Sequence, residues 1–321
     1  MHRLVAALVV LAGAAAICNL AHAQYPNRPI RFIVPFPPGG LADVLGRTLS
    51  AHVTPALGQQ IIVDNRSGAD GAIAAEITMK AAADGYTIFM GTNSPLSAVP
   101  SFRKKPPYDP VTNFTPITSL GRPVFFLFVH PSMPVRTVDE LVQYARANPG
   151  KVAYGTGNTT AIVATAQFRM LAKLDITHVP YKGDNPTTQD LVGGRLQMAF
   201  MATVPGYGQA REGKLRILAT LLPQRSAMAP DAPTMAEVGY PGVSIYPWIA
   251  LFGPARMPQD IVQRLAREFN AVLNRPDISE NLNKQGFVPV GSTPAELGEL
   301  VKTQLEAWRK AVREAGIPQT D

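Results

Sequence analysis

Apolar residues follow two alternating patterns along the chain: short β-branched or aromatic runs, and longer stretches with apolar positions three and four residues apart. The short runs predict strands at residues 30–34, 61–63, 87–90, 124–129, 152–154, 197–200, 215–219 and 249–252. The longer stretches predict helices at residues 41–52, 72–82, 138–147, 162–171 and 187–192. Strands that alternate with helices are typical of an α/β protein with mostly parallel sheets.

The C-terminal segment is more helical than the rest of the chain. One helix is expected to begin near Pro258, with an apolar stripe that includes Leu265 and Phe269. A second helix is expected after Thr293, where Glu296 gives a capping pattern. We expect these helices to pack against a sheet of earlier strands.

The most informative segment is IRFIVPFPPGGLAD, at residues 30–43. Its prolines and glycines prevent the first predicted strand from continuing, so the chain must turn before a helical pattern begins at Leu41. Such a turn directs the N–H groups and the positive dipole end of a helix toward one point. That geometry suits a carboxylate or a phosphate. A tight strand-to-helix connection without a ligand explains this segment equally well.

Three further segments have the same character. They are GYTIFMGTNS at residues 85–94, YGTGNTT at 154–160 and HVPYKG at 178–183. Ligands of open α/β sheets lie beyond the carboxyl ends of strands, so we expect these loops to converge on one cleft. Several such loops together favour a ligand site more strongly than any one of them.

Residues 1–23 have the pattern of a cleaved secretory signal peptide. A basic start precedes an apolar run, and Ala21-His22-Ala23 forms a cleavage site. The run is too short and too alanine-rich for a membrane span. Cys18 leaves a lipoprotein open as an alternative, although Ile17 stands where a small residue is expected. Cleavage after Ala23 would leave a periplasmic chain without cysteine, which excludes disulfides and thiol chemistry.

The formal net charge of +7 changes this picture little. Lysine and arginine are scattered among apolar residues rather than gathered with aromatic ones, so nucleic-acid binding is not expected. A mildly positive surface would help to collect small anions, and it would equally serve solubility alone. The length predicts two domains, and we expect a monomer.

Catalytic and metal-binding patterns do not assemble. His52, His130 and His178 are widely separated, and no H-E-x-x-H, G-x-S-x-G, P-loop or G-x-G-x-x-G pattern is present. We therefore expect no catalytic residues, no metal and no cofactor. A secreted enzyme with an acid–base pair from distant carboxylates remains an alternative.

Seven ordered blocks carry a family resemblance. They are YPNRPIRFIVPFPPGGLAD (25–43), LGQQIIVDNRSGADG (57–71), DGYTIFMGTNSP (84–95), HVPYKG (178–183), APDAPTMAEVGYPG (229–242), YPWIALFGPARMP (246–258) and WRKAVREAGI (308–317). On these blocks the chain resembles the Bug (TctC-like) family, the substrate-binding proteins of tripartite tricarboxylate transporters. The resemblance covers nearly all of the chain after the signal peptide.

The resemblance implies a two-domain α/β fold of the type II periplasmic binding proteins, with the ligand cleft between the domains. Domain I would comprise residues 24–124 plus 248–321, and domain II residues 125–247. The implied site holds a carboxylate by backbone amides and ordered water rather than by arginine. Its residues, carried over one by one, are Phe36, Pro38, Gly39, Gly40, Asp43, Thr92, Asn93, Ser94, Thr156, Gly157, Asn158, Thr159, Thr160, Tyr181, Lys182 and Gly183.

Two departures from the family pattern bear on the ligand. The segment YGTGNTTAIVATAQF lacks the usual histidine, and Met201 replaces the aspartate of an F-D-x-x-P block. That aspartate could pair with the ammonium of an amino acid, whereas a methionine leaves a buried ammonium unpaired at high cost. We therefore expect a carboxylate without an amino group. Met201, Phe36 and Trp248 would line an apolar pocket that favours an aromatic acid, although all three also fit core positions.

The implied mechanism is capture of a small carboxylate by domain closure, followed by delivery to the permease subunits of a tripartite transporter. One alternative is a sensory binding protein that presents its ligand to a receptor kinase. The other is the secreted enzyme.

Overall fold

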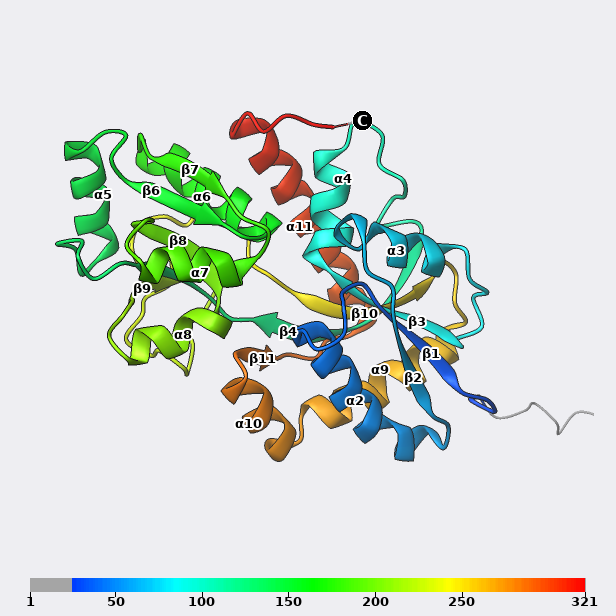
Figure 1. Cartoon of the computed structure of the whole chain (residues 1–321). Helices are drawn as coiled ribbons and strands as arrows, with labels where there is room; N and C mark the ends of the chain where they lie inside the picture. The colour runs from blue at the N-terminus through cyan, green and yellow to red at the C-terminus, as the bar shows by residue number, and fades with distance from the viewer. Residues whose placement is uncertain (1–24, 321) are drawn as a thin grey trace, which may run out of the picture.

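The computed structural model describes residues 25–320. The expected signal peptide, with Cys18, lies outside these residues. Two sheets, each covered by helices, form two lobes that lie side by side (Figure 1). We call the lobe with the six-stranded sheet the first lobe, and the lobe with the five-stranded sheet the second lobe.

The first lobe has the strand order β11-β4-β10-β3-β1-β2. Its strands are β1 (Ile30–Val34), β2 (Ile61–Asn65), β3 (Thr87–Thr92), β4 (Phe114–Pro123), β10 (Ile249–Pro254) and β11 (Phe287–Pro289). Its helices are α2 (Leu41–Leu57), η2 (Ala69–Gly71), α3 (Ala72–Met79), η3 (Ser94–Ala98), α4 (Val99–Phe102), α9 (Gln259–Leu273), α10 (Pro276–Lys284) and α11 (Pro294–Glu314).

The second lobe has the strand order β7-β6-β8-β5-β9. Its strands are β5 (Phe125–Val129), β6 (Ala153–Thr156), β7 (Thr177–Pro180), β8 (Met198–Ala202) and β9 (Arg216–Thr220). Its helices are α5 (Val138–Ala147), α6 (Thr159–Ala172), α7 (Asp184–Val192) and α8 (Thr203–Arg211). At the junction of the lobes, α6 contacts α11 (Figure 1).

Both sheets are mixed, so the prediction of mostly parallel sheets is wrong. Strand β1 pairs in parallel with β2 and β3, and β6 does so with β7 and β8. The pairs made by β4, β5, β10 and β11 are antiparallel. The reason is that β4 leads directly into β5 of the other lobe and β10 returns from it. Strands β5 and β10 therefore enter their sheets from the other lobe and not through the crossover helix that parallel neighbours require.

The elements that the sequence did not predict have weak local signals. Strand β4 includes Pro116, Gly121 and Pro123, which are depleted in strands. Helix α8 contains a proline and two glycines, which lower helix propensity. Tertiary packing, rather than local preference, holds these segments in regular structure. The capping pattern at Thr293 and Glu296 is confirmed, because each side chain accepts a hydrogen bond from the backbone N–H of the other.

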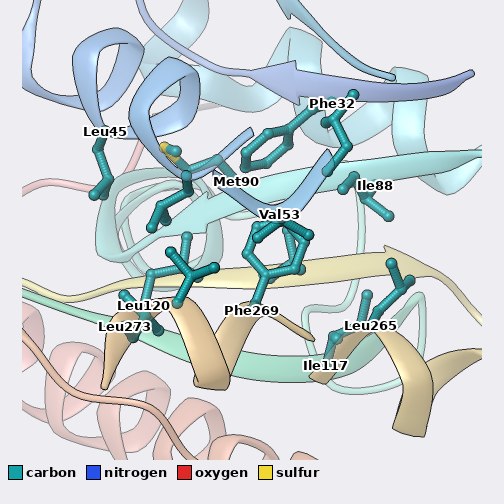
Figure 2. Close-up of a cluster of buried hydrophobic side chains, with 14 of the residues drawn as sticks. Phe32, Leu45, Val53, Ile88, Met90, Ile117, Leu120, Leu265, Phe269 and Leu273 are labelled. Atoms are coloured by element: carbon teal, nitrogen blue, oxygen red, sulfur yellow. The ribbon is translucent and has the colours of Figure 1, made fainter. Parts of the chain in front are cut away.

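The core of the first lobe fixes the position of β1 and of the loop that follows it. Helices α2 and α9 pack their apolar stripes against one face of the sheet (Figure 2). Phe32 of β1 and Phe269 of α9 meet edge to face, with ring centroids 6.2 Å apart. Leu45 of α2 and Met90 of β3 belong to the same cluster, and all four side chains are fully buried. The strand and the helix that flank the PFPPGG loop are therefore anchored in one core.

Among residues 25–320, no helix combines the length and the apolar character that a membrane crossing requires.

Replacing Phe269 with alanine should lower the free energy of unfolding by about 3–5 kcal/mol, because the change leaves a cavity between α9 and β1. Urea denaturation followed by circular dichroism measures this loss. Val111→Ala is the control, since that side chain is 40% exposed and its loss should change stability by no more than about 0.5 kcal/mol. Equal stability of the two variants would contradict the packing described for α9.

Candidate functional site

A cavity of about 500 Å³ lies between the two lobes, and we call it the cleft. The β1–α2 loop and the end of β3 line it from the first lobe, together with the end of β4 and the start of β10. We call β4 and β10 the crossing strands, because the chain passes between the lobes at the end of β4 and at the start of β10. The starts of α6 and β5 and the end of β8 line it from the second lobe. Its lining residues are Phe36, Pro37, Pro38, Gly40, Leu41, Ala42, Thr92, Asn93, Ser94, Pro123, Phe125, Asn158, Thr160, Ala202, Pro247 and Ile249.

The PFPPGG loop is held in place by side chains outside the cleft. Asn65 Nδ2 donates to the Phe36 carbonyl at 3.0 Å, and the Gly39 N–H donates to Asp43 Oδ2 at 2.9 Å. Gly39 has a φ of +83°, a conformation that glycine adopts without strain. Asp43 is also paired with Arg47, whose Nη2 lies 3.0 Å from Asp43 Oδ1. The loop is therefore shaped before any ligand arrives.

Asp43 is the charged group most closely tied to this loop. The hydrogen bond from Arg47 lowers the pKa of Asp43 below its ordinary value of 3.8, and the bond from the Gly39 N–H lowers it further. The carboxylate is 4% exposed. Its negative charge is compensated locally, so it does not oppose an anion at the start of α2.

Two helices from opposite lobes begin at the cleft. Helix α2 starts after Gly40, which provides no side-chain cap, and Leu41 and Ala42 of its first turn line the cavity. Helix α6 starts after Asn158, and Thr160 of its first turn lines the opposite wall. First-turn N–H groups have no acceptor inside a helix and attract anions. Among the described residues, those lining the cleft include no Asp, Glu, Lys, Arg or His. The geometry therefore suits an anion held by backbone and hydroxyl groups.

The second-lobe wall is organised by Asp184, a residue that the sequence analysis did not single out. Asn158 Nδ2 donates to Asp184 Oδ1 at 2.8 Å, and the Ala202 N–H donates to Asp184 Oδ2 at 3.1 Å. Asn158 Oδ1 accepts from the Ala161 N–H and so caps α6. Burial raises the pKa of Asp184, and the two donors act in the opposite direction.

Two side-chain hydrogen bonds join the lobes at the edge of the cleft. Asn93 Nδ2 donates to Thr160 Oγ1 at 2.7 Å, and Ser94 Oγ lies 3.3 Å from Thr159 Oγ1. The first of these bonds is buried. The residues after β3 therefore contact the start of α6 directly.

The structure brings about half of the predicted site residues to the cleft. Those that line it are Phe36, Pro38, Gly40, Thr92, Asn93, Ser94, Asn158 and Thr160. Gly39, Asp43 and Thr159 lie beside it and make the contacts described above. Thr156, Gly157, Tyr181, Lys182, Gly183, Met201 and Trp248 are not among the residues that line it.

In the HVPYKG loop, Tyr181 contacts helix α7 and Gly183 contacts the loop after β6. Tyr181 OH donates to Asp190 Oδ2 at 2.7 Å, and burial together with this bond raises the pKa of Tyr181 to about 12. A Cβ on Gly157 would lie 2.3 Å from the carbonyl carbon of Gly183, so only glycine permits this approach of two loops. Thr156 Oγ1 lies 2.7 Å from His178 Nε2, away from the cleft.

Met201 and Trp248 are fully buried in separate hydrophobic clusters. Met201 Sδ accepts a hydrogen bond from Thr188 Oγ1 of α7 at 3.4 Å. Trp248 packs against Phe252, with ring centroids 6.2 Å apart. The side chains that reach the cleft are those of the next residues in each strand, Ala202 and Ile249.

Several lining residues were missed by the sequence analysis. They are Pro37, Leu41, Ala42, Pro123, Phe125, Ala202, Pro247 and Ile249. Most of them lie inside or next to predicted strands or the PFPPGG loop. The sequence predicts these segments, but it does not predict which of their side chains point toward the cleft. The positions where the chain passes between the lobes could have indicated Pro123, Phe125, Pro247 and Ile249, because a cleft between two lobes borders such segments.

Within residues 25–320, no three His, Cys, Asp or Glu side chains lie close enough together to hold a metal ion.

Comparisons with known proteins show which family this chain and its fold are similar to. Residues 45–317 match the profile of the tripartite tricarboxylate transporter family receptor. The chain is 35% identical to Protein BugT of Bordetella pertussis, with 98% of each chain covered. The structure of R. palustris Rpa4515 with adipate is 32% identical, with a TM-score of 0.79, and 92% of this chain and 99% of that chain are covered. MatC from Rhodopseudomonas palustris with bound malate is 28% identical, with a TM-score of 0.73 and coverage of 90% and 100%.

The contribution of Asp43 to stability should depend on pH. The pKa of Asp43 in the folded protein is lowered. The ionised carboxylate therefore stabilises the fold fully above about pH 3.8, and this stabilisation is lost as the pH falls through the folded pKa. Asp43→Asn should therefore be less stable than the wild type at neutral pH, and the difference should shrink as the pH falls below about 3.8. Urea denaturation across this range measures it, with the exposed Asp175→Asn as the charge control. A difference that stays constant down to about pH 2 would contradict the role given to the ionised form.

Proposed function

The chain belongs to the tripartite tricarboxylate transporter receptor family of periplasmic solute-binding proteins, and on that premise we propose that it captures a small carboxylate without an amino group. The captured acid is delivered to the permease subunits of a tripartite transporter. Its relatives and structural neighbours are solute-binding proteins and not enzymes, so the secreted enzyme is set aside. No observation on the described residues favours the sensory alternative.

The observation that carries the proposal is the pair of helix starts that line the cleft from opposite lobes. The first turns of α2 and α6 supply N–H groups from opposite lobes, and Thr92, Ser94 and Thr160 add hydroxyl groups. A carboxylate bound there receives hydrogen bonds without a cationic side chain. The ligands named for two structural neighbours, adipate and malate, are carboxylates.

The rest of the lining supports an acid with an apolar body and no ammonium group. Phe36, Pro123, Phe125, Pro247 and Ile249 form an apolar wall that matches a ring or a short alkyl chain. No carboxylate of the described residues lines the cavity, and both oxygens of Asp184 behind its wall already accept hydrogen bonds from Asn158 and the Ala202 N–H. An ammonium in the cleft would therefore have no direct ionic partner, and burying one unpaired is costly. Met201, whose replacement of an aspartate predicts an amino-free ligand, lies in the core. The proposal of an amino-free ligand is therefore based on the residues that line the cleft. An aromatic acid fits this wall.

Closure of the two lobes is the proposed means of capture. The lining comes from both lobes, and the Asn93–Thr160 bond already joins them on one side. A ligand favours the closed form only as far as it binds that form more tightly. We propose that the moving bodies are residues 24–124 plus 248–321 and residues 125–247, which meet at the crossing segments.

A thermal-shift panel on protein refolded free of carried-over ligand tests the ligand class. Benzoate, nicotinate, hexanoate and citrate are compared with aspartate and glutamate. An acid at one hundred times its dissociation constant should stabilise the protein by about 2.7 kcal/mol, which is several degrees for a chain of this size. We expect shifts only with the amino-free acids. The largest shift with an amino acid would overturn the amino-free proposal, and no shift with any acid would overturn carboxylate capture.

Closure is tested separately by small-angle X-ray scattering. The acid that gives the largest thermal shift should reduce the radius of gyration at saturation, because the lobes approach each other around it. An unchanged radius would contradict closure while leaving carboxylate binding intact. In the source organism, loss of uptake of the same acid after deletion of the gene is the result expected for delivery to a permease. Loss of induced transcription alone would instead favour sensing.

A further inference from the structure

Asp184 places a carboxylate directly behind the second-lobe wall of the cleft. Its two oxygens accept hydrogen bonds from Asn158 Nδ2 and from the Ala202 N–H, at 2.8 and 3.1 Å. Both donors belong to residues that line the cavity. A single layer of donor groups therefore separates this carboxylate from whatever the cleft contains.

The charge of Asp184 is not compensated by a cation. Among the described residues, no Lys, Arg or His side chain forms an ion pair with Asp184, whereas Asp43 at the other wall is paired with Arg47. The nearest groups to Asp184 are neutral amide donors. The two ends of the cleft consequently differ in electrostatic character. Both ends have a helix start, but the carboxylate near the α2 end is neutralised by Arg47, whereas the carboxylate behind the α6 end has no cationic partner among the described residues.

The donors on the second-lobe side are also partly occupied. The Ala161 N–H donates to Asn158 Oδ1, the Ala202 N–H donates to Asp184, and the Thr203 N–H donates to the Val124 carbonyl. Fewer N–H groups remain there for a ligand than at the start of α2. A second carboxylate of the ligand at this wall would find few free donors and the like charge of Asp184 behind the wall, which opposes it.

We propose that Asp184 makes the cleft selective for monocarboxylates, with the carboxylate at the α2 end and a neutral group facing Asn158. This inference rests on the proposed function and names the substrate class more narrowly. It also distinguishes this chain from the neighbours whose ligands, adipate and malate, carry two carboxylates. Asp184 acts through the charge that it places behind the wall, and it does not itself line the cavity.

Isothermal titration calorimetry with matched acids tests the selectivity. The pairs are hexanoate with adipate and benzoate with terephthalate. The second acid of each pair carries a carboxylate in place of the terminal methyl group or of a ring hydrogen. For the wild type we expect the monocarboxylate of a pair to bind at least about tenfold more tightly, which corresponds to about 1.4 kcal/mol. The measured quantity is the ratio of the two dissociation constants within a pair.

Three variants assign this ratio to Asp184. Asp184→Asn removes the charge and should lower the discrimination about tenfold. The double variant Asn158→Asp with Asp184→Asn keeps every donor matched to an acceptor, because the new amide can donate to position 158 and accept from the Ala202 N–H. It moves the charge into the wall itself and should restore or increase the discrimination. Asp175→Asn removes an exposed charge of the same lobe and should leave the ratio unchanged.

The outcomes separate the two proposals. If Asp184 had only a structural role, both acids of a pair would lose affinity alike in Asp184→Asn and the ratio would stay constant, which would overturn the inference. A wild type that binds adipate or terephthalate as tightly as the matched monocarboxylate would also overturn it, while carboxylate capture would stand. If no acid bound the wild type, the proposed function would fail and the inference with it.

Discussion

The N–H groups in the first turn of α2 have no acceptor within the helix, and residues of this turn line the cleft. Burying such donors without a partner is costly, so a helix start that faces a cavity must meet water or an anion. The core between α2, β1 and α9 prevents the helix from shifting to avoid this exposure. Asn65, Asp43 and Gly39 then fix the loop before it. The packing of the first lobe thus holds this helix start where water or an anion can meet its N–H groups.

Charge is managed differently at the two walls. In the first lobe, Arg47 neutralises the carboxylate of Asp43, so the helix start keeps its attraction for an anion. In the second lobe, Asp184 is held only by neutral donors. No side-chain cation of the described residues lines the cavity between them. We therefore propose that backbone electrostatics decides which acids bind, and that the Asp184 carboxylate behind the second-lobe wall changes this balance.

Local patterns were sufficient where a residue's neighbours in the sequence decide its environment. The prolines and glycines between residues 35 and 40 end β1 and leave a loop, and the apolar spacing from Leu41 onward forms α2. The capping pair at Thr293 and Glu296 is equally local. The family resemblance predicts individual cleft residues, which local patterns alone do not. Residues 92–94, Asn158 and Thr160 are predicted in this way, and they line the cleft.

The sequence by itself determined the α/β class, the loop before α2 and the family, because these depend on short-range pattern and on ordered blocks of residues. Only the tertiary structure decided the mixed sheets, the contribution of the crossing strands to the cleft, and which face of β8 and β10 a side chain occupies. Met201 and Ala202 are adjacent in sequence, yet one lies in the core and the other at the ligand wall. A strand places successive side chains on opposite faces, and only the packing of α6 and α7 on that strand decides which face is which.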